Sequence, residues 1–312
     1  MLKTFLAAAT SVALSATVAI AEYPEKPIDL IVPFEPGGGT DITARMVQPG
    51  LEAALGQKLV IRNLEGAGGT VGATQLSKMP SDGYSIGYMP IGTMTTQPHI
   101  RRTSYNADSW EPICMVISDA VSILVNPDKS GIKSLEELVS AASGGNQLIS
   151  AGPPPGSLPH IGQAALASAY GLDFKYVPYK GGGPTAKALT AGDVDVFINT
   201  PNFAKKFEFT PLALMAPARH PDFPDLPTTA ELGGPEMDIS IWFGLFAPAG
   251  TDSAIIQKLS DACGEVVNSD AFKSTASERG NSAKYLSAEE FRTFFRNEFD
   301  ANAELLSKAG LK

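Results

Sequence analysis

The stretch Val32-Pro33-Phe34-Glu35-Pro36-Gly37-Gly38-Gly39-Thr40-Asp41 joins an apolar run to the predicted start of a helix. Residues 28–32 are typical of a buried strand, and Thr40 or Asp41 is suited to be the helix N-cap. Unpaired amides and the dipole at a helix N-terminus favour an anion, and three glycines let the backbone approach a ligand closely. By itself, however, this first glycine loop is somewhat more typical of an ordinary tight connection than of a binding site.

A second unit of the same kind follows and changes that interpretation. The apolar run at residues 59–62 leads into Gly66-Ala67-Gly68-Gly69-Thr70, the second glycine loop, and then into a predicted helix over residues 70–79. Two such loops after successive strands would lie side by side at the carboxyl edge of one parallel sheet. Ligands of open α/β sheets bind at that edge. The pair of loops therefore predicts a ligand site.

Residues 1–21 have the features of a secretory signal peptide. Lys3 supplies the positive charge, residues 5–18 are apolar and small, and Ala19-Ile20-Ala21 fits the peptidase. We predict cleavage between Ala21 and Glu22 and a periplasmic location. A membrane anchor is the alternative, but the apolar run is short for a span and is diluted by serine and threonine.

The composition indicates a globular protein with a small-molecule partner. The chain has 312 residues, of which 44% are hydrophobic and 18% charged, and its net charge of −9 argues against nucleic acid or an anionic membrane as partner. An anionic small ligand is not excluded, because loop amides act locally. Both cysteines, Cys114 and Cys263, lie in apolar patterns. We interpret them as core residues in preference to a disulfide, although an oxidising compartment would permit one.

The rest of the chain alternates strands and helices, which predicts an α/β fold. A second strand–loop–helix series runs from residue 148 to residue 198, so two lobes are expected. The helix over residues 40–55 should be kinked or broken at Pro49-Gly50. Residues 91–96 should form a loop after the third strand, and Thr251 and Ser287 should begin the last two helices.

Motifs for catalysis or for cofactors are missing from the sequence. Neither glycine loop fits G-x-G-x-x-G, and the chain has no phosphate-binding P-loop, G-x-S-x-G or H-E-x-x-H pattern. Ser157 and His160 are three residues apart, so a catalytic pair is conceivable, and Asp41 could act as a general base. Capping, ligand hydrogen bonds and loop organisation are the preferred roles for these side chains. We therefore predict no metal, no cofactor and no enzymatic activity.

Several short motifs in order resemble one family, the tripartite tricarboxylate transporter substrate-binding proteins, also called Bug or TctC-like. The resemblance extends over essentially the whole chain after the signal peptide. It rests on both glycine loops and on Asp82-Gly83-Tyr84, Gly156-Ser157 with His160, Val177-Pro178-Tyr179-Lys180-Gly181, Gly192-Asp193-Val194-Asp195, Trp242-Phe243-Gly244 and Ala247-Pro248-Ala249-Gly250-Thr251.

This resemblance implies a periplasmic binding protein of the type II kind. Its two lobes would each be a mixed, mostly parallel sheet flanked by helices, and two crossing strands would join them. Lobe 1 would comprise residues 22–122 plus 241–312, lobe 2 residues 123–240, with hinges near residues 122–126 and 239–243. The protein, a monomer, would close on a small carboxylate and deliver it to the integral-membrane permease subunits of a tripartite transporter. A di- or tricarboxylate, an aromatic carboxylate or an acidic amino acid is the expected ligand.

The same resemblance implies a set of ligand-binding positions. These are Phe34, Glu35, Gly37, Gly38, Gly39, Thr40, Asp41, Gly68, Gly69, Thr93, Gly156, Ser157, His160, Tyr179 and Asn199. We expect backbone amides to hold one carboxylate, so that Gly38→Val is more harmful than loss of Arg45 or Arg62, which we place outside the cleft. Glu35 stands where the family usually has a small residue, and the chain after Asn199 departs from the family pattern. The alternatives are an exported hydrolase or isomerase using Ser157, His160 or Asp41, and a receptor for a membrane sensor.

Overall fold

The structure is a computed structural model that describes residues 23–145, 147–308 and 311. The predicted signal peptide and the bond between Ala21 and Glu22 lie outside these residues. No helix within the described residues is both long and apolar enough to cross a membrane.

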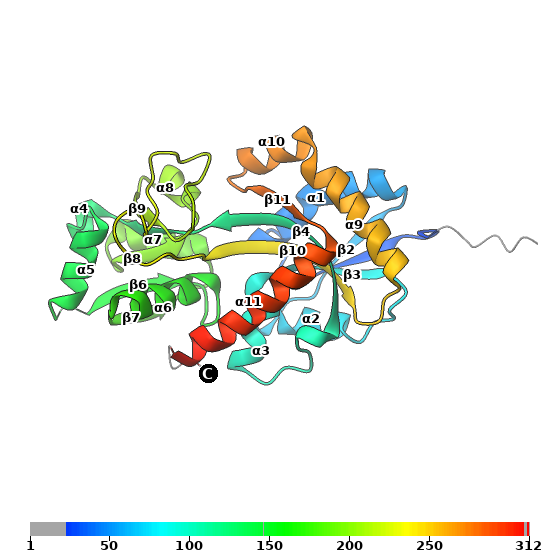
Figure 1. The fold of residues 1–312 in the computed structure, drawn as a ribbon, viewed down its shortest axis with the longest axis horizontal. Helices are drawn as coiled ribbons and strands as arrows, with labels where there is room; N and C mark the ends of the chain where they lie inside the picture. The colour runs from blue at the N-terminus through cyan, green and yellow to red at the C-terminus, as the bar shows by residue number, and fades with distance from the viewer. Residues whose placement is uncertain (1–22, 146, 309–310, 312) are drawn as a thin grey trace, which may run out of the picture.

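The chain folds into two α/β lobes, each built on one sheet (Figure 1). In lobe 1 the six strands lie in the order β11-β4-β10-β3-β1-β2, and in lobe 2 the five strands lie in the order β7-β6-β8-β5-β9. The strands are β1 (Ile28–Val32), β2 (Leu59–Asn63), β3 (Ser85–Pro90), β4 (Trp110–Ala120), β5 (Ser122–Val125), β6 (Leu148–Gly152), β7 (Phe174–Pro178), β8 (Val196–Asn199), β9 (Thr210–Leu214), β10 (Ser240–Pro248) and β11 (Ala283–Leu286).

Helices cover both faces of each sheet, as the alternating pattern predicts (Figure 1). They are α1 (Gly39–Leu55), α2 (Thr70–Leu76), α3 (Gln97–Ile100), α4 (Pro127–Ser130), α5 (Leu135–Ser143), α6 (Leu158–Tyr170), α7 (Gly182–Ala191), α8 (Asn202–Phe207), α9 (Ser253–Asn268), α10 (Asp270–Glu278) and α11 (Ala288–Lys308). The sequence interpretation missed the short helices α3 and α4 as well as α8, α10 and strand β11.

The two glycine loops leave neighbouring parallel strands, as the sequence predicts. β1 pairs in parallel with β2, with Val32 opposite Asn63, and also pairs in parallel with β3. Each strand ends at the same edge of the sheet, so the loops that follow emerge together.

The chain crosses between the lobes at one hydrogen-bonded junction. β4 belongs to the first sheet and β5 to the second, with only Val121 between them, and the chain returns into β10 through Ile239. The amide of Val121 donates to the carbonyl of Ile239 (3.1 Å), and the amide of Met215 donates to the carbonyl of Val121 (2.8 Å). The crossing segments therefore lie side by side in a narrow ladder.

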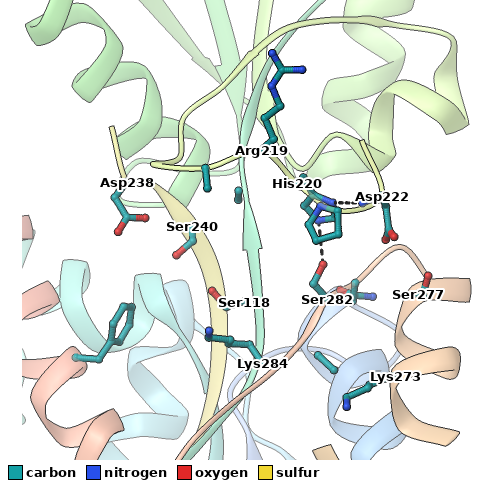
Figure 2. A pocket seen from close by; sticks show the side chains of 16 residues that line it. Ser118, Arg219, His220, Asp222, Asp238, Ser240, Lys273, Ser277, Ser282 and Lys284 are labelled. Carbon is teal, nitrogen blue, oxygen red and sulfur yellow. Dashed lines mark hydrogen bonds between the residues drawn. The ribbon is translucent and has the colours of Figure 1, made fainter. Parts of the chain in front are cut away.

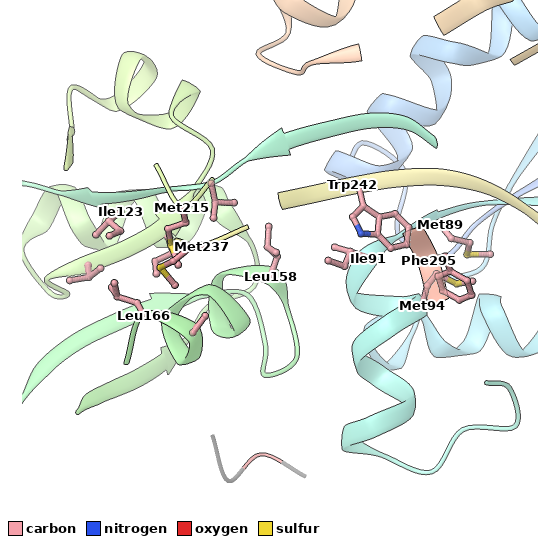
Figure 3. Close-up of a cluster of buried hydrophobic side chains, with 14 of the residues drawn as sticks. Met89, Ile91, Met94, Ile123, Leu158, Leu166, Met215, Met237, Trp242 and Phe295 are labelled. Atoms are coloured by element: carbon pink, nitrogen blue, oxygen red, sulfur yellow. The ribbon is translucent and has the colours of Figure 1, made fainter. Parts of the chain in front are cut away.

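Apolar packing continues from one lobe to the other. One buried cluster contains Trp242 and Ile91 of lobe 1 together with Leu158 of lobe 2. In Figure 3, Leu158 projects from α6 toward the lobe that carries Ile91 and Trp242. Helix α11 packs on β4 and also contacts α6 of the other lobe, so its phenylalanine stripe contributes to the core of lobe 1 while its end reaches lobe 2 (Figure 1).

Cys114 and Cys263 form a disulfide that links β4 to α9, with 6.6 Å between their Cα atoms. Both residues are fully buried, so their assignment to the core is confirmed. The preference for two unlinked cysteines was wrong. Their separation of 149 residues explains why local sequence patterns gave no sign that the two side chains meet.

Helix α1 runs without a break through Pro49, so the expectation of an interruption there was wrong. Pro49 is exposed, so water can hydrate the carbonyl that loses its helical partner. Gly50 faces α9, and a Cβ at this position would overlap the side chain of Val266. The close packing of α1 against α9 at Gly50 therefore keeps residues 49–50 helical, although proline and glycine have low intrinsic helix propensity.

Three local assignments also need correction. The N-cap of α1 is Gly38, with neither Thr40 nor Asp41 in that role, and the N-cap of α9 is Asp252 instead of Thr251. Residues Gly92–Thr96 form a π-helical turn that leads directly into α3, where we expected a loop. Such turns are rare, and they occur often at functional sites.

Candidate functional site

A buried carboxylate braces the first glycine loop. Asp41 accepts hydrogen bonds from the amide of Gly37 (2.9 Å), from Nε of Arg45 (2.8 Å) and from Nδ2 of Asn63 (2.9 Å). Burial alone would raise the pKa of Asp41, but these three donors lower it to about 2. Asp41 is therefore an anion that organises the loop, which agrees with its preferred assignment from sequence.

The first turn of α1 leaves donors free for a ligand. The amides of Gly39, Thr40 and Asp41 have no acceptor within the described part of the chain, whereas the amide of Gly38 donates to the carbonyl of Glu35 (3.2 Å). Free amides at the start of a 17-residue helix attract a carboxylate. The Glu35 side chain is exposed, and its Cγ lies above Gly38.

The second glycine loop meets Thr93 and Phe34. Gly68 and Gly69 both have left-handed φ values, +69° and +88°. A Cβ on Gly69 would overlap Thr93 Oγ1 and would lie 3.2 Å from a ring carbon of Phe34. Thr93 Oγ1 donates to the carbonyl of Gly68 (3.1 Å). Four of the sequence-predicted positions thus share one wall.

Lobe 2 contributes the turn before α6. The amide of Gly156 donates to Nδ1 of His160 (3.1 Å), which leaves Nε2 to carry the proton of the neutral ring. Burial lowers the pKa of His160 and so favours this neutral form. His160 can therefore offer a ligand a neutral N–H, whereas a cation at this position is disfavoured.

The two lobes touch where these loops face each other. A Cβ on Gly92 of lobe 1 would lie 3.2 Å from the carbonyl oxygen of Gly156 in lobe 2. A Cβ on Gly156 would overlap Ile100 and would lie 3.0 Å from Nε2 of Gln97. The second glycine loop and the turn before α6 are therefore brought together, with Gln97 between them.

Two predicted positions stand apart from this arrangement. Asn199 Oδ1 accepts the amide hydrogen of Thr200 (2.8 Å), and the Asn199 carbonyl accepts from Ser122 (3.1 Å). Tyr179 lines a separate hollow of about 420 Å³ with Pro154 and Lys180. Among the described residues, no hydrogen bond joins either of them to the glycine loops of lobe 1.

The side chains considered for catalysis have other partners. Ser157 Oγ donates to the carbonyl of Pro153 (3.0 Å), and the hydroxyl of Tyr176 donates to the same oxygen (2.7 Å). His160 Nδ1 accepts from Gly156, and among the described residues no hydrogen bond joins Ser157 Oγ to the His160 ring. Within the described residues, no cluster of histidine, cysteine or acidic side chains is arranged to hold a metal.

Sequence reasoning missed two residues of this region. Asn63 ends β2 and donates to both Asp41 and the carbonyl of Phe34 (2.9 Å each), so it ties the two strand ends together. Its place directly after a predicted strand was an available signal. Gln97 follows the unforeseen π-helical turn, and nothing in the local pattern distinguished it.

A second hollow, of about 630 Å³, is larger than the one at Tyr179 and is lined by residues of α10, β11 and the chain around His220. Figure 2 shows Arg219, His220 and Asp222 of lobe 2 on one side and Ser282 and Lys273 of lobe 1 on the other. His220 accepts the amide hydrogen of Asp222 at Nδ1 (3.1 Å) and bonds Ser282 Oγ through Nε2 (3.0 Å). Volume alone would favour this cavity as the ligand site, but the free amides and paired glycine loops lie elsewhere.

Comparison with known proteins decides the family. Residues 43–311 match the model of the tripartite tricarboxylate transporter family receptors, TctC. The chain belongs to this family. A TctC-family relative, BugT of Bordetella pertussis, is 31% identical over 310 residues, which cover 96% of this chain and 94% of BugT.

Solved structures of similar proteins share the fold. A Rhodopseudomonas palustris protein determined with adipate has a TM-score of 0.82 at 28% identity and covers 93% of this chain and 99% of its own. MatC from the same species, determined with bound malate, has a TM-score of 0.79 at 26% identity. The match covers 91% of this chain and 100% of the MatC chain. The predicted two-lobed periplasmic binding protein fold is therefore confirmed, since the periplasmic binding protein BugD also shares it, with a TM-score of 0.79 at 28% identity. A similar protein from Polaromonas is a TctC solute-binding protein.

Proposed function

We propose that this chain is a periplasmic receptor that captures a small carboxylate between its two lobes and delivers it to the membrane subunits of a tripartite transporter. The observation that carries the proposal is the set of unpaired amides at Gly39, Thr40 and Asp41, beside the wall formed by Gly69, Thr93 and Phe34. A carboxylate can accept several of these hydrogen bonds at once, with no cationic side chain required.

Two features of the site support a carboxylate in preference to a neutral solute. The helix dipole and the free amides of α1 both attract negative charge. Asp41, the buried anion nearby, is already neutralised by Arg45 and by two further donors, so it does not cancel this attraction. Similar proteins with adipate and malate add support from the family.

Capture would require the lobes to close as rigid units. We divide the mature chain, as the sequence predicts, into lobe 1, residues 22–122 plus 241–312, and lobe 2, residues 123–240. The sheets change at Val121 and again before Ser240, which lies within one or two residues of these bounds. The narrow ladder at the crossing can act as a hinge, and motion there would also change the contact between α11 and α6. Small-angle scattering should show compaction on ligand addition, and an unchanged radius of gyration would contradict closure.

Delivery to a transporter requires export, for which residues 1–21 are suited. N-terminal sequencing of periplasmic material should begin at Glu22, because Ala19-Ile20-Ala21 fits the signal peptidase. Recovery of an intact residue 1 from that material would contradict the assignment. We further expect the mature protein to elute as a monomer in size-exclusion chromatography.

The function is tested by a thermal-shift screen followed by titration calorimetry. The ligands are matched series of mono-, di- and tricarboxylates, aromatic carboxylates and acidic amino acids, together with neutral amides of the same size. A ligand at 100 times its Kd adds about 2.7 kcal/mol to the free energy of unfolding, which is readily detected. Stabilisation by acids and not by their amides is expected. Stabilisation by no carboxylate would overturn the proposal.

A further inference from the structure

Gln97 occupies an unusual position at the contact between the lobes. It begins α3 directly after the π-helical turn over Gly92–Thr96, and only 4% of the residue is exposed. Its carboxamide lies against both glycine-rich elements: Nε2 is 3.0 Å from where a Cβ would stand on Gly68 and the same distance from that position on Gly156. One side chain of lobe 1 therefore contacts the loops of both lobes.

This carboxamide lacks a partner in the described structure. Oε1 of Gln97 is inaccessible to solvent and accepts no hydrogen bond from any described residue. The hydroxyl of the preceding residue, Thr96, is also buried without a partner, and it lies 3.8 Å from where a Cβ would stand on Gly92. Buried polar atoms are almost always hydrogen-bonded, so these two atoms at one junction need a partner from outside the described residues, either a ligand group or a water.

The glycines beside Gln97 let its side chain lie close to both loops. Gly68 and Gly156 both have left-handed φ values, +69° and +82°, which favour glycine at these positions. Oε1 is 3.3 Å from where a Cβ of Gly68 would stand, so a side chain at that position would press against this oxygen. A carbonyl oxygen accepts hydrogen bonds and does not donate them, so the missing group is a donor.

We propose that Gln97 is a specificity-determining residue that accepts a hydrogen bond from a hydroxyl or ammonium group next to the bound carboxylate. The preferred ligands are therefore 2-hydroxy- or 2-amino-carboxylates, and plain aliphatic acids bind less tightly. We place this donor next to the carboxylate because Gln97 contacts Gly68, and the adjacent residue, Gly69, forms the proposed site wall with Thr93 and Phe34. This inference rests on the proposed carboxylate receptor function and names its ligand class.

Because Gln97 lies between the lobes, it should also affect how strongly a ligand favours the closed form. When the lobes separate, the carboxamide loses Gly156 and becomes hydrated, whereas closure without a suitable ligand buries Oε1 unpaired. A ligand with a donor at carbon 2 removes that penalty, so it favours the closed form more than a ligand without one.

Titration calorimetry with succinate, L-malate and L-aspartate tests the proposal. These four-carbon acids differ only at carbon 2, which carries hydrogen, hydroxyl or ammonium. For the unmodified protein, we expect malate or aspartate to bind about ten- to a hundredfold more tightly than succinate. Gln97→Met keeps the length of the side chain and removes its amide, and should reduce this preference to about threefold or less, mainly through weaker binding of the preferred acid.

Gln48→Met is the matched control. Gln48 lies on α1, donates to the carbonyl of Leu59 on β2 (2.8 Å) and takes no part in the junction. This variant should retain the preference. If succinate binds the unmodified protein as tightly as malate and aspartate, or if Gln97→Met weakens all three acids equally, the proposal is overturned. The comparison in the unmodified protein needs no variant, so misfolding of Gln97→Met would not prevent a decision. Failure of every carboxylate to bind would instead overturn the receptor function, and this inference with it.

Discussion

The carboxylate of Asp41 accepts the amide hydrogen of Gly37 at 2.9 Å, inside the loop whose backbone amides were expected to hold a ligand carboxylate. Gly37 is therefore occupied before any ligand arrives. The remaining donors are those of Gly39, Thr40 and Asp41, and the loop that carries them is held in place by Asn63 and Arg45 as well. Because these hydrogen bonds already order the loop, less conformational entropy is lost when a ligand binds.

Replacement of Asp41 by asparagine should weaken both binding and stability. The folded-state pKa of about 2 lies below the reference value of 3.8, so Asp41 stabilises the fold above pH 3.8, and this contribution is lost as the pH falls toward 2. We expect Asp41→Asn to lower the free energy of unfolding by about 1–2 kcal/mol at pH 7, with a smaller difference near pH 2.5. Urea denaturation at both values measures this.

Arg62→Ala is the control for Asp41→Asn. Arg62 on the edge strand β2 pairs with the half-buried Asp29 on the neighbouring strand β1. Because Arg62 is 54% exposed, its loss should change carboxylate affinity by less than about threefold. Arg45→Ala should have an intermediate effect, because it removes one of the donors to Asp41. An Arg62→Ala variant that loses binding would show that a side-chain cation holds the ligand.

Gly69→Ala should be more harmful to the site than Gly38→Ala. Gly69 has a φ of +88°, and a Cβ would overlap Thr93 Oγ1. Gly38 has a φ of −73°, which other residues also adopt, so replacing this glycine costs little backbone freedom. A harmful effect of Gly38→Val on binding would therefore come only from its side chain blocking the ligand. Calorimetry should show at least tenfold weaker carboxylate binding for Gly69→Ala and less than about threefold for Gly38→Ala. Equal losses would contradict the wall formed by Gly69 and Thr93.

Replacement of Glu298 by glutamine should stabilise the protein at high pH. Burial raises the pKa of Glu298 to about 7, while its Oε2 accepts a hydrogen bond from Trp242 Nε1 (3.3 Å). The folded state therefore binds a proton that the unfolded state loses above pH 4.5, and stability falls as the pH rises through this window. We expect Glu298→Gln to exceed the unmodified protein by about 1–3 kcal/mol at pH 8 and to match it near pH 4.5.

Denaturation curves at the two pH values measure the effect of Glu298→Gln. Glu265→Gln, at an exposed position of α9, serves as the matched control and should show no gain at either pH. A gain for Glu298→Gln that is the same at pH 4.5 and pH 8 would point to better packing and would argue against relief of a buried charge.

Loss of the disulfide should destabilise the protein without changing its ligand site. The Cys114–Cys263 bond closes a separation of 149 residues within lobe 1, away from both glycine loops. We expect Cys114→Ala with Cys263→Ala to lower the free energy of unfolding by about 2–5 kcal/mol and to leave carboxylate affinity unchanged. Because both sulfurs are buried, thiol labelling after reductant treatment should require denaturant. Labelling without denaturant, or stability equal to the unmodified protein, would contradict the linkage.

Local patterns were enough to predict the α/β fold and one half of the candidate site. Apolar runs followed by glycines mark strands β1 and β2, and parallel pairing then places Gly37–Gly39 and Gly68–Gly69 at one sheet edge. The cap of α5 is equally local, since Ser134 Oγ accepts from the amide of Glu137 three residues later. All these relations join residues that are close in the chain or in adjacent repeating units.

Only the tertiary structure decided which distant groups meet. The disulfide, the continuous path of α1 past Gly50 and Val266, and the position of Gln97 between Gly68 and Gly156 all join segments far apart in the sequence. Their energies come from packing and from hydrogen bonds that form once the sheets are assembled, and no local propensity encodes them. The sequence by itself determined the order of strands, glycine loops and helices; the burial of Oε1 of Gln97 depends on the approach of two lobes.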